Sequence, residues 1–169
     1  RALAVLAWLA GLAKEQGDII PLRVGKGAYW DSELKISQQN GYSSYPVYTR
    51  KEGTDVSFLA CARFLLSEHL RGLIYPQFAS HNAHTIAAIN AMASHSEFEF
   101  QRLHGMGEAL YHHVVELLGH HVRIYAPVGS HRELLPYLVR RLLENGANSS
   151  FVHRLVDVNC SPDELIEHP

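Results

Sequence analysis

The ten residues LIYPQFASHN, at positions 73–82, contain the pattern that decides the fold. The run from Leu73 to Phe78 is apolar and rich in β-branched and aromatic side chains, which is typical of a buried strand. Polar residues follow, and a helical pattern begins near Asn82. A strand followed directly by a helix predicts one βα unit.

Three further apolar runs repeat this pattern along the chain. They are Ile20–Val24, Phe98–Leu103 and Val122–Pro127. The helices after these runs are expected to begin near Trp30, with a second helix from Thr54, near Gly105 and near Ser130. Strands separated by helices cannot pair as hairpins, so we expect a parallel sheet with helices packed outside it. The sequence thus predicts an α/β fold with functional residues at the carboxyl ends of the strands.

The last predicted helix has clear start and stop signals. Ser130 and Glu133 are spaced as a capping box, and Gly146 is placed to end the helix. An apolar stripe is formed by Leu134, Leu135, Leu138, Leu142 and Leu143. Pro136 lies beyond the first turn and is expected to kink the helix, because it removes a backbone hydrogen bond.

Length and composition exclude several classes of protein. The chain has 169 residues and 47% apolar content, which is enough to bury a core and excludes a disordered protein. A net charge of -2 gives no general attraction to nucleic acid or acidic membranes. Two cysteines, Cys61 and Cys160, are too few for a disulfide framework, so a reducing compartment is expected. Cys61 lies in an apolar sequence and is predicted to be buried.

The number of βα units bears on the architecture. An ordinary parallel barrel has eight strands, and four units are predicted here. The chain begins with Arg1 in a helical pattern, so we expect it to be a piece of a longer polypeptide. The apolar run Ala2–Leu12 is too short to span a membrane, which takes about 20 residues. An open doubly wound sheet is the alternative, but residues 25–28 match neither the dinucleotide nor the Walker glycine pattern.

Polar and aromatic residues gather where the predicted strands end. They are Arg23, Lys26, Tyr29, Trp30, Gln77, Ser80, His81, Asn82, Gln101, Arg102 and Tyr125. The carboxyl ends of parallel strands meet at one edge of a sheet or one face of a barrel, so these side chains are expected to converge.

Seven stretches resemble the proline dehydrogenase domain of the bifunctional bacterial flavoenzymes called proline utilization A. They are VGKGAYWD (24–31), YPVYTRK (45–51), TDV (54–56), YPQFASHN (75–82), FEFQRLHGMGE (98–108), YAPVG (125–129) and YLVRRLLENGAN (137–148). The resemblance runs in order from Pro21 to Arg154. One departure is Gly25, which stands where that family usually has valine.

The resemblance implies a distorted (βα)8 TIM-like barrel that binds FAD. Residues 1–169 would be its carboxyl-terminal half, with strands five to eight, the last helix and no separate second domain. Arg23 matches an arginine beside flavin N5, where a cation favours the electron-rich reduced flavin. Further cofactor contacts are matched by Val24, Gly25, Gly27, Ala28, Trp30, Thr49, Arg50, Lys51, His81, Asn82, Gln101 and Glu144.

The resemblance also implies the substrate site. Arg140 and Arg141 match the pair that binds the amino acid carboxylate, and a guanidinium fork suits a planar carboxylate. Tyr29, Leu103 and Tyr125 match the walls around the pyrrolidine ring, which direct its C5 hydrogen toward flavin N5 and exclude water. The catalytic group implied is therefore Arg23, Tyr125, Arg140 and Arg141.

The activity implied is FAD-dependent oxidation of L-proline to Δ1-pyrroline-5-carboxylate, with electrons passed to a membrane quinone. A fused pyrroline-5-carboxylate dehydrogenase module is expected outside this chain. No nucleic-acid contact is expected from this segment. The implied location is the cytoplasm of a bacterium, peripheral to the inner membrane face.

Two other readings stay open at this stage. Arg140 and Arg141 would hold a phosphate in a phosphate-binding (βα)8 isomerase or aldolase. The chain would otherwise be a noncatalytic half-barrel that only packs against the missing half, and alone it is expected to bind FAD weakly or not at all. The histidine pairs His81 with His84 and His112 with His113 lack a third ligand at suitable spacing, so no metal is expected.

Overall fold

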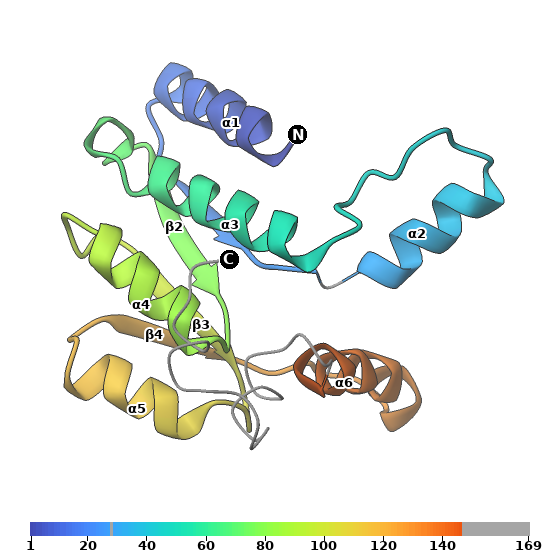
Figure 1. Ribbon diagram of the computed structural model, residues 1–169. Coiled ribbons are helices and arrows are strands. Elements are labelled where there is room, and N and C mark those ends of the chain that lie inside the picture. Colours follow the sequence, from blue (N-terminus) through green and yellow to red (C-terminus); the bar gives the residue numbers. More distant parts are fainter. Residues whose placement is uncertain (28, 147–169) are drawn as a thin grey trace. The chain divides into compact units, whose positions relative to one another are not determined.

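The computed structural model describes residues 1–27 and 29–146, with side chains described up to residue 141. Four strands form one parallel sheet in the order β1-β2-β3-β4, so the predicted α/β class is confirmed (Figure 1). The elements in chain order are α1 (Ala2–Gln16), β1 (Ile20–Val24), α2 (Trp30–Gln39), α3 (Lys51–Leu65), the 3-10 helix η1 (Glu68–Leu70), β2 (Ile74–Ala79), α4 (Ala83–Met92), β3 (Glu99–Leu103), α5 (Glu108–Glu116), β4 (His121–Tyr125) and α6 (His131–Gly146).

The chain divides into two compact units. The first unit comprises residues 1–25 and 57–126 and contains the whole sheet with α1, α4, α5 and most of α3. The second unit comprises residues 26–56 and 127–169, of which 26–27, 29–56 and 127–146 are described.

The strands agree closely with the apolar runs of the sequence. β1 has the predicted bounds, and the other three strands differ by one or two residues at their ends. β4 ends at Tyr125 and leaves out Ala126 and Pro127. Proline has no backbone N–H for a sheet ladder, which accounts for an end before Pro127.

Three helices begin where the predictions placed them, α2, α4 and α6, and two do not. α2 begins at Trp30, and Asn82 caps α4 by accepting a hydrogen bond from the Thr85 N–H at 2.9 Å. α5 begins at Glu108 instead of near Gly105, because Gly105 and Gly107 have φ values of 79° and 66° and turn the chain first. α3 begins at Lys51, three residues before the predicted start.

The start of α6 has half of the predicted capping box. The carboxylate of Glu133 accepts hydrogen bonds from the N–H and the hydroxyl of Ser130, at 3.0 and 2.9 Å. The return bond runs from the Glu133 N–H to the Ser130 carbonyl instead of its side chain, at 3.0 Å. Pro136 lies inside the helix as predicted, and Gly146 is its last residue.

One face of the sheet is apolar and packs against helices. Phe78 and Phe100 are fully buried, with ring centroids 6.3 Å apart. Buried residues of α1, α3, α4 and α5 join the same core, and Figure 1 shows α3 and α4 running across the strands. Cys61 of α3 is buried in this core, and burial raises the pKa of its thiol. No helix in the described part of the chain is long and apolar enough to cross a membrane.

The other face of the sheet carries polar side chains. Side chains alternate between faces along a strand, so β3 presents Phe100 to the core and Glu99 and Gln101 to the opposite side. The register pairs Arg23 with Gln77, Gln77 with Glu99, and Gln101 with Arg123. Charged and amide groups from all four strands therefore share one face.

Candidate active site

Three of the predicted site residues come together in the first unit. Arg23 is next to last in β1, and its Nε donates a hydrogen bond to Gln101 Oε1 at 2.8 Å. Its guanidinium carbon lies 4.8 Å from the ring centroid of Tyr125, the last residue of β4. A guanidinium over an aromatic face is attractive. The ends of β1, β3 and β4 thus hold one cation between an amide and an aromatic ring.

A buried carboxylate lies on the other side of the Gln101 amide. Glu99 accepts hydrogen bonds from Gln77 Nε2 at 3.0 Å and Gln101 Nε2 at 2.7 Å. Arg123 donates to both carboxylate oxygens, at 2.7 and 2.8 Å. The bond from Arg123 holds the pKa of Glu99 below its usual range, although burial opposes this effect. Glu99 is therefore an ionised acceptor at neutral pH.

The predicted cofactor residues after β2 bind neighbouring backbone. His81 Nε2 accepts a hydrogen bond from the Leu103 N–H at 3.0 Å, which places the proton of the neutral ring on Nδ1. The hydroxyl of Tyr111 contacts the carbonyls of Ser80 and Gln101. These bonds fix the turn between β2 and α4 against the end of β3.

In the second unit, Tyr29 lies against Arg140. The Arg140 guanidinium carbon is 5.7 Å from the Tyr29 ring centroid, and that of Arg141 is 5.2 Å from the ring of Tyr137. The Nε atoms of both arginines are buried, although each side chain as a whole is half-buried. Two guanidinium groups are thus held beside aromatic rings from two parts of the sequence.

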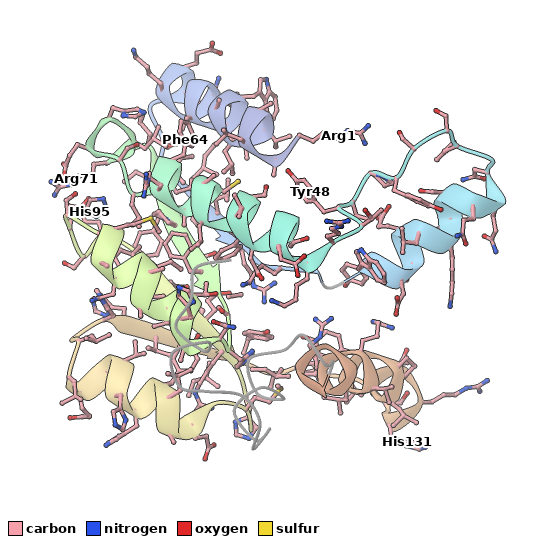
Figure 2. The ribbon with its side chains drawn as sticks, in the orientation of Figure 1. Arg1, Tyr48, Phe64, Arg71, His95 and His131 are labelled. Carbon is pink, nitrogen blue, oxygen red and sulfur yellow. The ribbon has the colours of Figure 1, made fainter. Side chains whose placement is uncertain are left out.

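The loop between α2 and α3 is fixed by one tryptophan and one carboxylate. Trp30 Nε1 donates to the Tyr48 carbonyl at 2.8 Å, and Tyr48 is labelled in this loop in Figure 2. Asp55 binds Lys26 Nζ at 2.6 Å and Lys51 Nζ at 2.5 Å. Burial raises the pKa of Asp55, but the two lysines outweigh burial and lower it overall.

Thr49 and Arg50 are exposed in the same loop, immediately before α3. The resemblance to the proline dehydrogenase family implies cofactor contacts by Thr49, Arg50 and Lys51. Two of these residues are basic, and Lys51 is oriented by Asp55. The loop therefore presents positive charge of the kind that a phosphate group binds.

Gly25 and Gly27, which follow β1, differ in whether the structure favours glycine at their positions. Gly27 has φ 62°, a backbone conformation that favours glycine. A Cβ added at Gly25 would lie 3.9 Å from the Cβ of Ala79, which is ordinary van der Waals contact. The space at Gly25 therefore admits a Cβ atom.

Three predicted site residues remain, and the structure describes a side chain for only one of them. Leu103 is 2% exposed at the end of β3. Ala28 lies outside the described residues, as does the side chain of Glu144, whose backbone is part of α6. Among the described residues, no group of three or more His, Cys, Asp or Glu side chains is placed to hold a metal ion.

Sequence reasoning did not identify Glu99, Arg123 or Asp55 as site residues. Glu99 had a detectable signal, because it is a charged residue inside a strand whose neighbours are apolar. Asp55 had a weaker signal, because Lys51 lies four positions before it in a predicted helix. Its other partner, Lys26, is 29 positions away and could not be found from spacing. Arg123 alternates with apolar residues as an ordinary solvent-facing side chain does.

A cavity of about 450 Å³ lies at the opposite, amino ends of the strands. Its lining includes Ile19, Ile74, Arg71, His95 and His121. Figure 2 labels Arg71 and His95 at this end of the sheet. Arg71 forms ion pairs with Glu68 and Glu97. None of the predicted site residues lines this cavity.

Comparisons with known proteins agree with the sequence resemblance. The family model described as proline dehydrogenase matches residues 1–154. The bifunctional protein PutA of Escherichia coli is 53% identical over 178 aligned positions, covering 100% of this chain and 13% of that protein. Human mitochondrial proline dehydrogenase 1 is 30% identical over 152 positions, covering 85% of this chain and 25% of that protein.

A solved structure gives the same result. The chain matches proline utilization A from Bradyrhizobium japonicum with a TM-score of 0.90 and 52% identity, covering 100% of this chain and 17% of that one. The chain spans about an eighth of the length of its bacterial relatives, 13% in the Escherichia coli protein. The match of 154 residues to the family model, with these relatives, establishes that this chain belongs to the proline dehydrogenase family.

Proposed function

We propose that this chain is the carboxyl-terminal half of a (βα)8 barrel that binds FAD and oxidises L-proline to Δ1-pyrroline-5-carboxylate. In this proposal β1 to β4 are strands five to eight and α6 is the last helix. The electrons pass on to a membrane quinone. The observation that carries the proposal is the contact between Arg140 and Tyr29, two residues implied for one substrate pocket and far apart in the sequence.

The half-barrel is supported by the open polar face of the sheet. Arg123 forms a two-bond ion pair with a buried carboxylate, yet its own side chain is 61% exposed. β1 and β4 are the edges of the described sheet. Four more strands pairing with these edges would close the barrel and enclose the polar face, because closure leaves no unpaired edge.

The residues at the strand ends fit a flavin in the chemistry of their donors. Arg23 offers a cation held by Gln101 and Tyr125, and its bond to Gln101 uses only Nε. When bound, FAD supplies the redox chemistry, because its ring takes up the hydride that leaves C5 of proline. A fixed cation beside that ring stabilises the negative charge of reduction without reorganising. Lys51 and Arg50 would hold the phosphate end.

The substrate carboxylate would bind Arg140 and Arg141. Both side chains are half-buried, and rings of Tyr29 and Tyr137 restrict their guanidinium groups. Restriction lowers the entropy cost of binding a carboxylate. Tyr29, Leu103 and Tyr125 would surround the pyrrolidine ring, keep water out and hold C5 at one orientation. The side chains of this chain thus bind and orient, and none acts as a nucleophile.

The test replaces each arginine in the complete protein with methionine. Arg140→Met and Arg141→Met should each raise the proline KM by about tenfold to a hundredfold, since a hydrogen bond to a charged group contributes about 1.5–3 kcal/mol. The FAD dissociation constant should change far less. Arg132→Met is the matched control, because Arg132 is an exposed arginine of the same helix. Equal losses of proline and FAD binding, or no loss of either, would contradict the assignment.

Family membership argues against a phosphate-binding isomerase or aldolase. Flavin absorbance in the purified complete protein, bleached by proline, would exclude it directly. A colourless protein that does not bind added FAD would overturn the proposed function.

A further inference from the structure

Glu99 accepts four hydrogen bonds on the polar face of the sheet, and the proposed function gives this residue no role. Its carboxylate is 5% exposed and accepts from Gln77, Gln101 and Arg123. The three donors come from β2, β3 and β4. Three of the four hydrogen bonds end on the same oxygen, Oε1. Burying a carboxylate is costly unless it is paired and hydrogen-bonded, and here it is both.

The carboxylate decides which way the amide of Gln101 points. An ionised carboxylate only accepts hydrogen bonds, so the amide nitrogen of Gln101 must face Glu99, at 2.7 Å. The amide oxygen then faces the other way, where it accepts from Arg23 Nε at 2.8 Å. The reversed amide would put an oxygen against the carboxylate and an N–H group against the guanidinium.

The guanidinium of Arg23 is therefore held through two hydrogen bonds in series. The bond to Gln101 fixes Nε of Arg23. The Tyr125 ring, whose centroid lies 4.8 Å from the guanidinium carbon, limits the orientation of the guanidinium plane. The two terminal nitrogens are not used by the bond to Gln101. In the proposed function, these two nitrogens would be the donors offered to a bound group.

We propose that Glu99 is a positioning residue for the flavin site, acting on Arg23 through Gln101. This inference rests on the proposed function, because it takes Arg23 to lie beside the flavin. Glu99 touches neither flavin nor substrate. It holds the amide of Gln101 in the orientation that presents a fixed cation, and the fixed cation favours the reduced flavin.

The test measures the midpoint potential of the bound flavin in the complete protein without proline. Glu99→Leu removes the acceptor at similar size, so Gln101 is free to reverse and Arg23 loses its fixed position. The equilibrium constant for two-electron flavin reduction should fall about tenfold, which equals about 30 mV toward negative potential. The kcat for proline oxidation should fall, and the proline KM should change less than threefold.

Two further variants separate positioning from general structural damage. Glu99→Gln keeps an acceptor oxygen at the Oε1 position. Its equilibrium constant for two-electron flavin reduction should therefore stay within threefold of the wild-type value. Gln77→Met removes another donor to the same oxygen but leaves the bond between Glu99 and Gln101, so it should also stay within threefold. If Glu99→Leu does not fold, Glu99→Asp replaces it, because the shorter carboxylate keeps its charge but withdraws from Gln101.

The outcomes distinguish this inference from the proposed function. A wild-type potential in folded, flavin-loaded Glu99→Leu or Glu99→Asp would overturn the positioning role and leave the proposed function intact. An equal shift in Gln77→Met would also overturn it, since the effect would then be structural. Failure of the wild-type protein to bind FAD would instead overturn the proposed function, and this inference with it.

Discussion

The two faces of the sheet are built by different physics, although the same strands form both. Phe78 and Phe100 lie fully buried on one face. The hydrophobic effect that stabilises this face is non-directional and proportional to the buried apolar area. Glu99 and Gln101 lie on the other face, where each donor must meet one acceptor. The apolar face therefore supplies stability, whereas the polar face supplies orientation at the strand ends.

The largest expected effect comes from the apolar face. Phe78 packs edge-to-face on Phe98 with centroids 5.7 Å apart and is 0% exposed. Phe78→Ala should lower the free energy of unfolding of the domain by about 3–5 kcal/mol, because it leaves a cavity between strand and helices. Ile124→Ala is the control, since Ile124 is 52% exposed, and should cost under about 1 kcal/mol. Urea unfolding of both variants tests this difference, and equal losses would contradict the assignment of the core.

The polar face should show a smaller effect that depends on pH. The pKa of Glu99 is lowered in the folded state, chiefly by Arg123, so its contribution is present at neutral pH, above the unfolded value of about 4.3. That contribution is lost as the pH falls through the lowered pKa. Glu99→Gln should therefore lower the free energy of unfolding by about 1–3 kcal/mol at pH 7, and the difference from wild type should vanish in acid. A difference that stays constant down to pH 3 would show that the carboxylate charge contributes nothing.

Most of the fold could be predicted because its signals are local. The strands are short apolar runs, and the run at Ile20–Val24 gave the observed bounds. Helix starts were less predictable, since a glycine allows a positive φ without requiring it. The sequence pattern therefore predicts α5 from Gly105, whereas Gly105 and Gly107 form a turn before the helix.

Some contacts of the candidate site could be predicted from a residue's position at a strand end, whereas others depend on the register between strands. Position at a strand end was enough to expect Arg23, Gln101 and Tyr125 on one edge, and the structure brings these three together. The bonds from Arg123 to Glu99 could not be predicted, because a diagonal contact between strands depends on their register. The apolar pattern decides which face each side chain takes, but a shift of two residues between strands keeps that pattern and changes the partners.

The smallest expected effect comes from changing Asn82, for which the sequence resemblance and the structure indicate different roles. The sequence resemblance implies a cofactor contact, whereas the structure shows an N-cap whose side chain accepts from the Thr85 N–H. Asn82→Ala should cost about 1 kcal/mol through loss of the cap, and the Thr85 amide should exchange its hydrogen faster. Asn82→Ser keeps a capping oxygen and should restore slow exchange, because serine caps nearly as well. If Asn82→Ser restores exchange at Thr85 but FAD affinity stays as low as in Asn82→Ala, the asparagine also contacts the cofactor. If both properties recover together, capping is sufficient to explain this residue.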